Sequence, residues 1–111
     1  MPEATEETKN LIGQFQNCQQ QLQSILIQKE SLKLQNIEIE RALEELNSTT
    51  QKTAYKITGQ IMINKPVDEL KKELNETKEN IELRIKSLEK TEERVNNKLK
   101  ELQSKLKEVI G

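Results

Sequence analysis

Apolar side chains recur along residues 5–48 with the alternating four- and three-residue spacing of a coiled-coil seam. Nine of the eleven seam positions are apolar, and the residues between them are largely Gln, Glu and Lys. The seam positions are Leu11, Phe15, Cys18, Leu22, Ile25, Lys29, Leu32, Asn36, Ile39, Leu43 and Leu46. The pattern predicts one long helix whose narrow apolar stripe packs against another helix.

Residues 66–110 repeat this pattern, with eleven of thirteen seam positions apolar. The positions are Val67, Leu70, Leu74, Thr77, Ile81, Ile85, Leu88, Glu92, Val95, Leu99, Leu102, Leu106 and Val109. Two four-residue steps follow each other at Thr77, which locally relaxes a left-handed supercoil. Pro66 suits the first position of this second helix. Two helices of matched length predict an antiparallel pair, with both termini at one end and the middle segment at the other.

Residues 49–65 have a different character, with β-branched residues around Gly59, and YKITGQIMIN predicts a β-hairpin. A three-residue turn, Thr58 to Gln60, would pair Ile57 with Ile61 and gather the apolar residues on one face. A two-residue Gly59-Gln60 turn would instead pair Ile57 with Met62 and divide them between two faces. We favour the first register because it allows one face to be buried, although Gly59 suits the second turn better.

A lone hairpin with an apolar face is marginally stable in water, so we expect this one to join hairpins of other chains. The alternative is a hairpin that folds back on its own helices. Lys52, Lys56 and Lys65 give the segment a balance of +3 and would guard its edges or form a small basic patch.

Composition excludes several functions. Charged residues make up 33% of the 111 residues, aromatic residues 2%, and there is no His. The single Cys18 cannot form an intrachain disulfide or a zinc site, and the three glycines are too scattered to bind phosphate. We therefore expect no enzymatic activity, catalytic residue, cofactor or metal. A net charge of −1 argues against nucleic acid, and the absence of a long apolar run argues against a membrane. One cysteine and a polar N-terminus, without a signal peptide, indicate the cytoplasm.

Apolar residues continue almost to the free ends of the two predicted helices. A terminal Leu or Ile left uncovered forgoes about 1.5–3 kcal/mol of burial. Two interpretations are open for these residues, namely ordinary seam packing to the end or a surface that binds a partner. The residues concerned are Leu11, Ile12 and Phe15 on the first helix and Leu106, Val109 and Ile110 on the second.

The order of these segments resembles a known family. A Gln-rich helix with GQFQNCQQQLQSILIQKESL, then RALEEL, YKITGQIMIN and a charged helix with EKTEERVNNKLKEL is similar to the beta subunit of prefoldin, the archaeal hexameric co-chaperone. The resemblance covers nearly the whole chain and is strongest at residues 14–22, 42–46 and 55–63. It implies a single domain over residues 1–111, with helices at 5–48 and 66–110 and one hairpin region at 49–65.

The resemblance also implies a function and partners. Prefoldins contain two alpha and four beta subunits, whose hairpins form an intersubunit β-barrel, and their coiled-coil tips capture unfolded proteins and pass them to a group II chaperonin without ATP. By this resemblance Tyr55, Ile57, Ile61, Met62 and Ile63 would serve oligomerisation. Leu11, Ile12, Phe15, Leu106, Val109 and Ile110 would hold the client. The competing hypothesis is a structural spacer or tether that docks on a partner through its hairpin.

Overall fold

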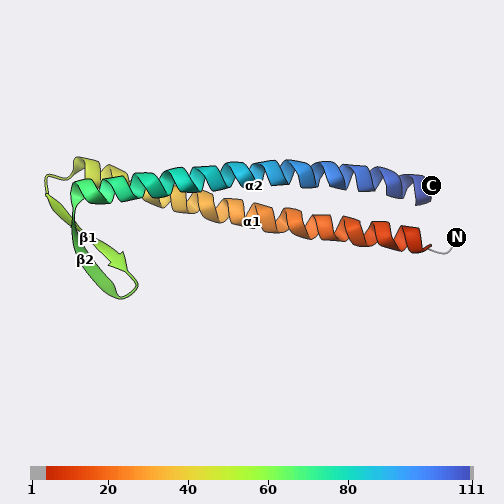
Figure 1. Cartoon of the computed structure of the whole chain (residues 1–111), viewed down its shortest axis with the longest axis horizontal. Coiled ribbons are helices and arrows are strands. Elements are labelled where there is room, and N and C mark those ends of the chain that lie inside the picture. The colour runs from red at the N-terminus through yellow and green to blue at the C-terminus, as the bar shows by residue number, and fades with distance from the viewer. Residues whose placement is uncertain (1–4, 111) are drawn as a thin grey trace. The chain divides into compact units, whose positions relative to one another are not determined.

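The computed structural model describes residues 5–110, which are mainly α-helical (Figure 1). Helix α1 spans Glu6–Ser48, and helix α2 spans Val67–Ile110. Between them, strands β1 (Thr53–Thr58) and β2 (Ile61–Pro66) form an antiparallel two-stranded sheet. The predicted fold class, two long antiparallel helices with one hairpin between them, is confirmed.

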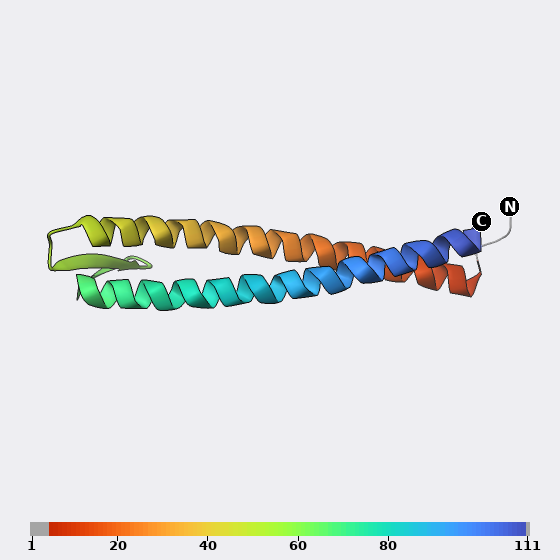
Figure 2. The ribbon, with the colours of Figure 1, turned by 90° about the horizontal axis from the view of Figure 1, so that it is seen from above.

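The chain divides into two compact units. The terminal unit comprises the described residues of Met1–Glu30 and Lys86–Gly111, and the hairpin unit comprises Ser31–Ile85. In the terminal unit, the first part of α1 runs antiparallel to the last part of α2, so the start of α1 lies beside the end of α2 (Figures 1 and 2). In the hairpin unit, the last part of α1 and the first part of α2 are joined through β1 and β2.

The core of the terminal unit is a single apolar cluster between the two helices. Its buried members are Leu11, Cys18, Ile25, Val95 and Leu102, and Phe15, Leu22, Leu88, Leu99 and Leu106 pack against them. Leu102 is 0% exposed, which no other large side chain of the described residues reaches. Every member is a predicted seam position, so the heptad pattern alone located this core.

Local hydrogen bonds set the ends of α1. Thr5 caps its start, because the Thr5 Oγ1 atom accepts a hydrogen bond of 3.1 Å from the Thr8 backbone N–H. At the other end the Thr49 N–H still donates to the Glu45 carbonyl at 3.1 Å, and the Ser48 hydroxyl donates to the same carbonyl at 3.2 Å. The helix therefore ends where Ser48 supplies a local alternative to the helical hydrogen-bond ladder.

All eleven predicted seam positions of α1 are buried or half-buried, which confirms its heptad pattern. The prediction for α2 is wrong at Thr77 and at Val109 in the last turn, which are both exposed. Lys78, next to Thr77, is half-buried instead. The Thr77 hydroxyl donates to the Glu73 carbonyl at 3.0 Å, so its polar atom is satisfied on the helix surface. The long Lys78 side chain can cover apolar surface with its stem while its ammonium reaches Glu40 at 3.5 Å.

The favoured hairpin register is wrong, and the alternative register is observed. Ile57 pairs with Met62, and Thr58 pairs with Ile61, which leaves a two-residue turn of Gly59 and Gln60. Gly59 has φ of +62°, and no other described residue has a positive φ. A positive φ at the first turn position alone is the pattern of a type II′ turn, whose twist matches that of the flanking strands. Turn geometry therefore determined the register.

Helix α2 begins directly where β2 ends. Pro66, expected at the first helical position, is instead the last residue of β2, opposite Thr53. Because proline has no N–H, it ends the ladder between the strands. The next residue, Val67, donates its N–H to the Lys52 carbonyl at 2.9 Å, which ties the start of α2 to the segment before β1.

Candidate functional site

The terminal unit brings together the six residues predicted to hold a client, here named the tip surface: Leu11, Ile12, Phe15, Leu106, Val109 and Ile110. Leu11 is buried in the seam, and Phe15 and Leu106 are half-buried against the same cluster. Ile12, Val109 and Ile110 are exposed, and Ile110 is 68% exposed. The tip surface therefore has a base packed in the seam, as the first interpretation expects, and three uncovered apolar side chains that seam packing does not account for.

Two polar seam residues meet in the terminal unit. The Lys29 ammonium lies 2.7 Å from the Glu92 Oε1 atom and 3.9 Å from the Glu89 carboxylate. The Lys29 side chain is only 12% exposed and that of Glu92 only 22%. The hydrogen bond from Lys29 to Glu92 holds the pKa of Lys29 above its ordinary value. Each residue interrupts the apolar pattern of its own helix, and together they form an ion pair across the seam.

The five residues predicted for oligomerisation, here named the hairpin surface, are Tyr55, Ile57, Ile61, Met62 and Ile63. They are 40–71% exposed. In the observed register Tyr55, Ile57 and Met62 lie on one face of the sheet, and Ile61 and Ile63 lie on the other. Both faces of a two-stranded sheet therefore expose large apolar side chains, and both of its outer edges are unpaired in the described residues.

The Glu73 carboxylate of α2 forms ion pairs with both strands of the hairpin. Glu73 binds the ammonium of Lys65 from β2 at 2.7 Å and that of Lys56 from β1 at 3.3 Å. The hydrogen bond from Lys65, and then that from Lys56, lowers the pKa of the Glu73 carboxyl, and the same bond to Glu73 raises the pKa of Lys65. Two of the three hairpin lysines are thus paired within the chain, which argues against a free basic patch.

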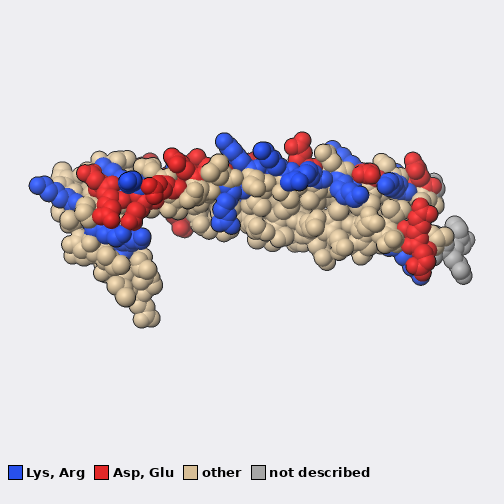
Figure 3. All heavy atoms as spheres, viewed as in Figure 1, with Lys and Arg blue, Asp and Glu red and all other residues tan. Residues whose placement is uncertain are grey.

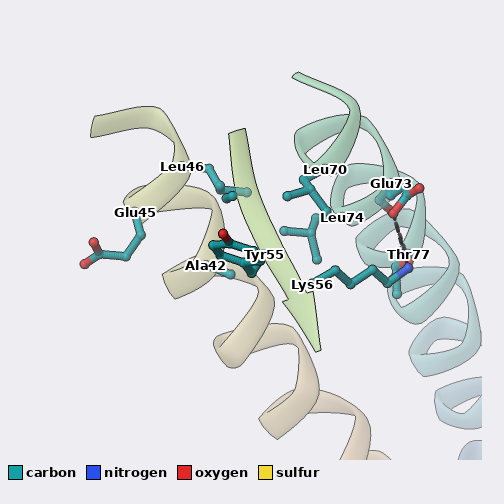
Figure 4. A pocket seen from close by; sticks show the side chains of 10 residues that line it. Ala42, Glu45, Leu46, Tyr55, Lys56, Leu70, Glu73, Leu74 and Thr77 are labelled. Carbon is teal, nitrogen blue, oxygen red and sulfur yellow. Dashed lines mark hydrogen bonds and ion pairs between the residues drawn. The ribbon is translucent and has the colours of Figure 1, made fainter. Parts of the chain in front are cut away.

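A hollow of about 410 Å³ remains beneath β1 in the hairpin unit. In the close-up view Tyr55 lies on the α1 side, beside Ala42, and Lys56 reaches toward Glu73 on the α2 side (Figure 4). Apolar side chains of both helices line the hollow, among them Leu46, Leu70 and Leu74. The hairpin is therefore tied to α2 through ion pairs, while most of its apolar surface stays uncovered.

Sequence reasoning missed two features. It did not single out Glu73, whose role depends on which strand residues face α2 and hence on the register. It also overlooked exposed apolar residues of α1 outside the seam, namely Leu26, Ile27, Leu34 and Ile37. Their helical spacing, read apart from the seam, would have revealed further apolar surface, because residues three apart such as Leu34 and Ile37 lie on the same face.

Three further features of residues 5–110 bear on function, namely possible metal ligands, possible membrane spans and the single cysteine. No group of three or more His, Cys, Asp or Glu side chains in this range could hold a metal ion. Over the same residues, neither helix combines the length and apolar character that a membrane span requires. Cys18 is free and buried in the seam, where it packs as a small apolar side chain.

Comparison with known proteins gives one consistent family. The sequence model described as "Prefoldin subunit" matches residues 9–111. The prefoldin subunit beta of Archaeoglobus fulgidus is 36% identical, over 100% of this chain and 97% of its own length. That of Methanospirillum hungatei is also 36% identical, over 99% of this chain and 92% of its own length.

A solved structure agrees with these relatives. The crystal structure of the prefoldin beta subunit from Thermococcus strain KS-1 is similar to this chain with a TM-score of 0.84. It is 32% identical in sequence, and the match covers 98% of this chain and 96% of that one. The likeness therefore includes both helices and the hairpin between them.

Proposed function

This chain belongs to the prefoldin family as a beta-type chaperone subunit, and from that premise we propose that it captures unfolded polypeptides at its tip surface. The prefoldin family is non-enzymatic, so we expect this subunit to act by binding other polypeptides. The observation that carries the proposal is the exposure of Ile12, Val109 and Ile110 above a packed base. Isolated apolar side chains of this kind bind unfolded chains weakly and without sequence preference, which lets a client be released.

Weak contacts become useful when several subunits act together. We propose that the hairpin surface joins this subunit to an alpha-type subunit and to further copies, in the hexamer of two alpha and four beta subunits that the family resemblance implies. Its exposed apolar faces and unpaired strand edges support this role. Several tips on one platform raise the effective concentration of binding sites, and avidity rises by about 10²–10⁴-fold when the geometry allows simultaneous contact.

We propose that the bound client then passes to a group II chaperonin, and that this transfer does not require ATP. Client capture and transfer would take place in the cytoplasm, since the single cysteine is free and suits a reducing compartment. No residue of the tip surface is charged or nucleophilic, so release depends on competition for apolar contacts and not on a chemical step.

The test is suppression of client aggregation by the complete complex. Changing Ile12, Val109 and Ile110 to Ser removes the three exposed apolar groups and leaves the buried base in place. Each fully buried side chain of this size contributes about 1.5–3 kcal/mol, so the triple variant is expected to lose most of its suppression. Light scattering of a denatured client diluted into buffer measures the effect.

The matched control changes Leu34, Ile37 and Leu83 to Ser. These three are similarly exposed, at 48–64%, but lie in the hairpin unit. The control is expected to suppress aggregation as the unaltered complex does. Equal loss in both variants would contradict a role of the tip surface, and a lack of suppression by the unaltered complex would favour the spacer hypothesis.

A further inference from the structure

The part of α1 in the terminal unit contains a long segment without charge. From Asn10 to Gln28, nineteen consecutive residues include no Asp, Glu, Lys or Arg, although these types make up 33% of the chain. Nine of the nineteen are Asn or Gln. In the space-filling view an uncharged surface covers this part of α1, whereas charged side chains gather over α2 (Figure 3). Outer positions of coiled coils usually carry Glu and Lys, so seam packing does not explain this segment.

A groove of about 420 Å³ runs between this segment and α2 within the terminal unit, here named the amide groove. Its apolar lining consists of Phe15, Leu22, Leu26 and Leu99. Amides flank it from both helices, Gln19 and Gln23 from α1 and Asn96 and Gln103 from α2. Lys100 is the one charged residue that lines it.

A primary amide has two N–H donors and a carbonyl acceptor, so it can bond both the C=O and the N–H group of a peptide unit. Within residues 5–110 the hydrogen bonds of side chains do not involve any of the four flanking amides, so their groups are free for a ligand. We propose that the amide groove binds an extended segment of unfolded polypeptide, with the amides bonding its main chain and the apolar lining contacting its side chains.

The chemistry of the groove selects for an unfolded chain. Buried main-chain N–H and C=O groups of a folded protein are already paired, whereas an unfolded segment presents them freely. A neutral rim neither repels nor prefers clients of either charge, which suits a chaperone that meets many sequences. The groove is also continuous with the tip surface, because Phe15 belongs to both. The inference rests on the proposed function and adds to it a main-chain binding site beyond the tip.

The experiment measures binding of labelled, unstructured peptides to the complete complex by fluorescence anisotropy. Two peptides share the same apolar residues, and one carries Asp and Glu where the other carries Lys and Arg. The variant is Gln19→Glu with Gln23→Glu, which keeps the side-chain shape, removes two donor groups and adds negative charge. Affinity for the acidic peptide is expected to fall on the order of tenfold, and affinity for the basic peptide clearly less.

The matched control is Gln16→Glu with Gln20→Glu, an exposed pair with the same spacing on the same helix, away from the groove lining. It adds the same charge and is expected to change neither affinity beyond twofold. A further probe is the acidic peptide N-methylated at alternate residues, which lacks the main-chain N–H donors at those residues. It is expected to bind the unaltered complex less tightly than the unmethylated acidic peptide does.

The outcomes separate this inference from the proposed function. If both pairs of substitutions weaken binding equally, or if neither does, the amide groove is not a binding site, while capture at the tip surface stands. Equal binding of the methylated and unmethylated peptides to the unaltered complex would also overturn main-chain recognition. If the unaltered complex binds no peptide, the proposed function itself fails.

Discussion

At the scale of single residues, the α1 side of the seam consists of nine apolar residues and two polar ones. All eleven seam positions of α1 are covered, including the polar Lys29 and Asn36. Of the predicted seam positions of α2, Val109 in the last turn and Thr77 are exposed. The Thr77 hydroxyl is satisfied on its own helix, and Lys78, one position later, covers the seam. Periodicity assigns positions by apolar character and so misses the apolar stem of a charged residue.

The first prediction concerns stability and the fully buried Leu102. Replacing it with Ala is expected to cost about 2–5 kcal/mol of the free energy of unfolding, because a fully buried leucine leaves a cavity. Replacing the 64% exposed Leu83 with Ala is expected to cost under about 0.5 kcal/mol. Urea unfolding followed by circular dichroism measures both. Equal costs would contradict the position of the seam.

At the scale of elements, the ion pair between Lys29 and Glu92 indicates how the two helices keep their alignment. A polar residue at a seam position lowers stability in exchange for a fixed register, and here each helix supplies one of opposite charge. The sequence revealed both interruptions but not that they face each other, since that depends on the offset between the helices.

Reversing the charges tests this alignment. Lys29→Glu and Glu92→Lys are each expected to lower the melting temperature, because each places like charges together in a poorly solvated seam. The double variant is expected to recover most of the loss. Reversal of Lys105 and Glu101, a more exposed ion pair of 3.2 Å within α2, is the control and is expected to have little effect. A double variant no more stable than the single variants would contradict the proposed alignment.

The hairpin register illustrates why one prediction failed. The favoured register assumed that a buried face would select the pairing, but both faces of the hairpin are exposed in the single chain. Burial therefore had no influence within the chain, and Gly59, with its positive φ, fixed the turn. Hydrophobic pattern predicts register reliably only where the same chain supplies the covering surface.

Acidification is expected to loosen the hairpin from α2. The pKa of Glu73 is lower in the folded chain than in the unfolded chain. Its contribution to stability is therefore present above the unfolded pKa and is lost as the pH falls through the lower folded pKa. We expect amide hydrogen exchange in β1 and β2 to become several-fold faster, relative to α2, over that acidic range.

Glu73→Gln provides the control for this pH dependence. The variant is expected to show fast exchange of the hairpin amides already at neutral pH and no further loosening attributable to this carboxyl on acidification. Glu76→Gln, an exposed change on the same helix, is expected to behave as the unaltered chain does. Slow exchange in the Glu73 variant at neutral pH would contradict its role as the fastening group.

At the scale of the whole molecule, the order of the segments along the chain predicted the family. The single chain leaves apolar surface uncovered in both units, at Ile57 and Met62 and again at Val109 and Ile110. Both surfaces consist of apolar residues, so composition alone does not distinguish a subunit interface from a client-binding surface.

We expect assembly with other subunits to depend on the hairpin surface. Changing Ile57 and Met62 to Ser removes two apolar side chains that lie opposite each other on one face of the sheet. The variant, mixed with the alpha-type subunit, is expected to sediment mainly as separate subunits, whereas Leu34→Ser with Ile37→Ser is expected to assemble normally. A hairpin variant that keeps the full assembly mass would contradict this role.

We propose that this subunit assembles through the hairpin surface and holds unfolded polypeptide with the tip surface. Native mass spectrometry of the complete complex mixed with a denatured client examines both roles at once. We expect the mass of the assembly plus client for the unaltered complex, and the mass of the intact assembly alone for the Ile12, Val109 and Ile110 variant. Client retained by that variant, or client bound to dissociated subunits, would show that these roles are wrongly assigned.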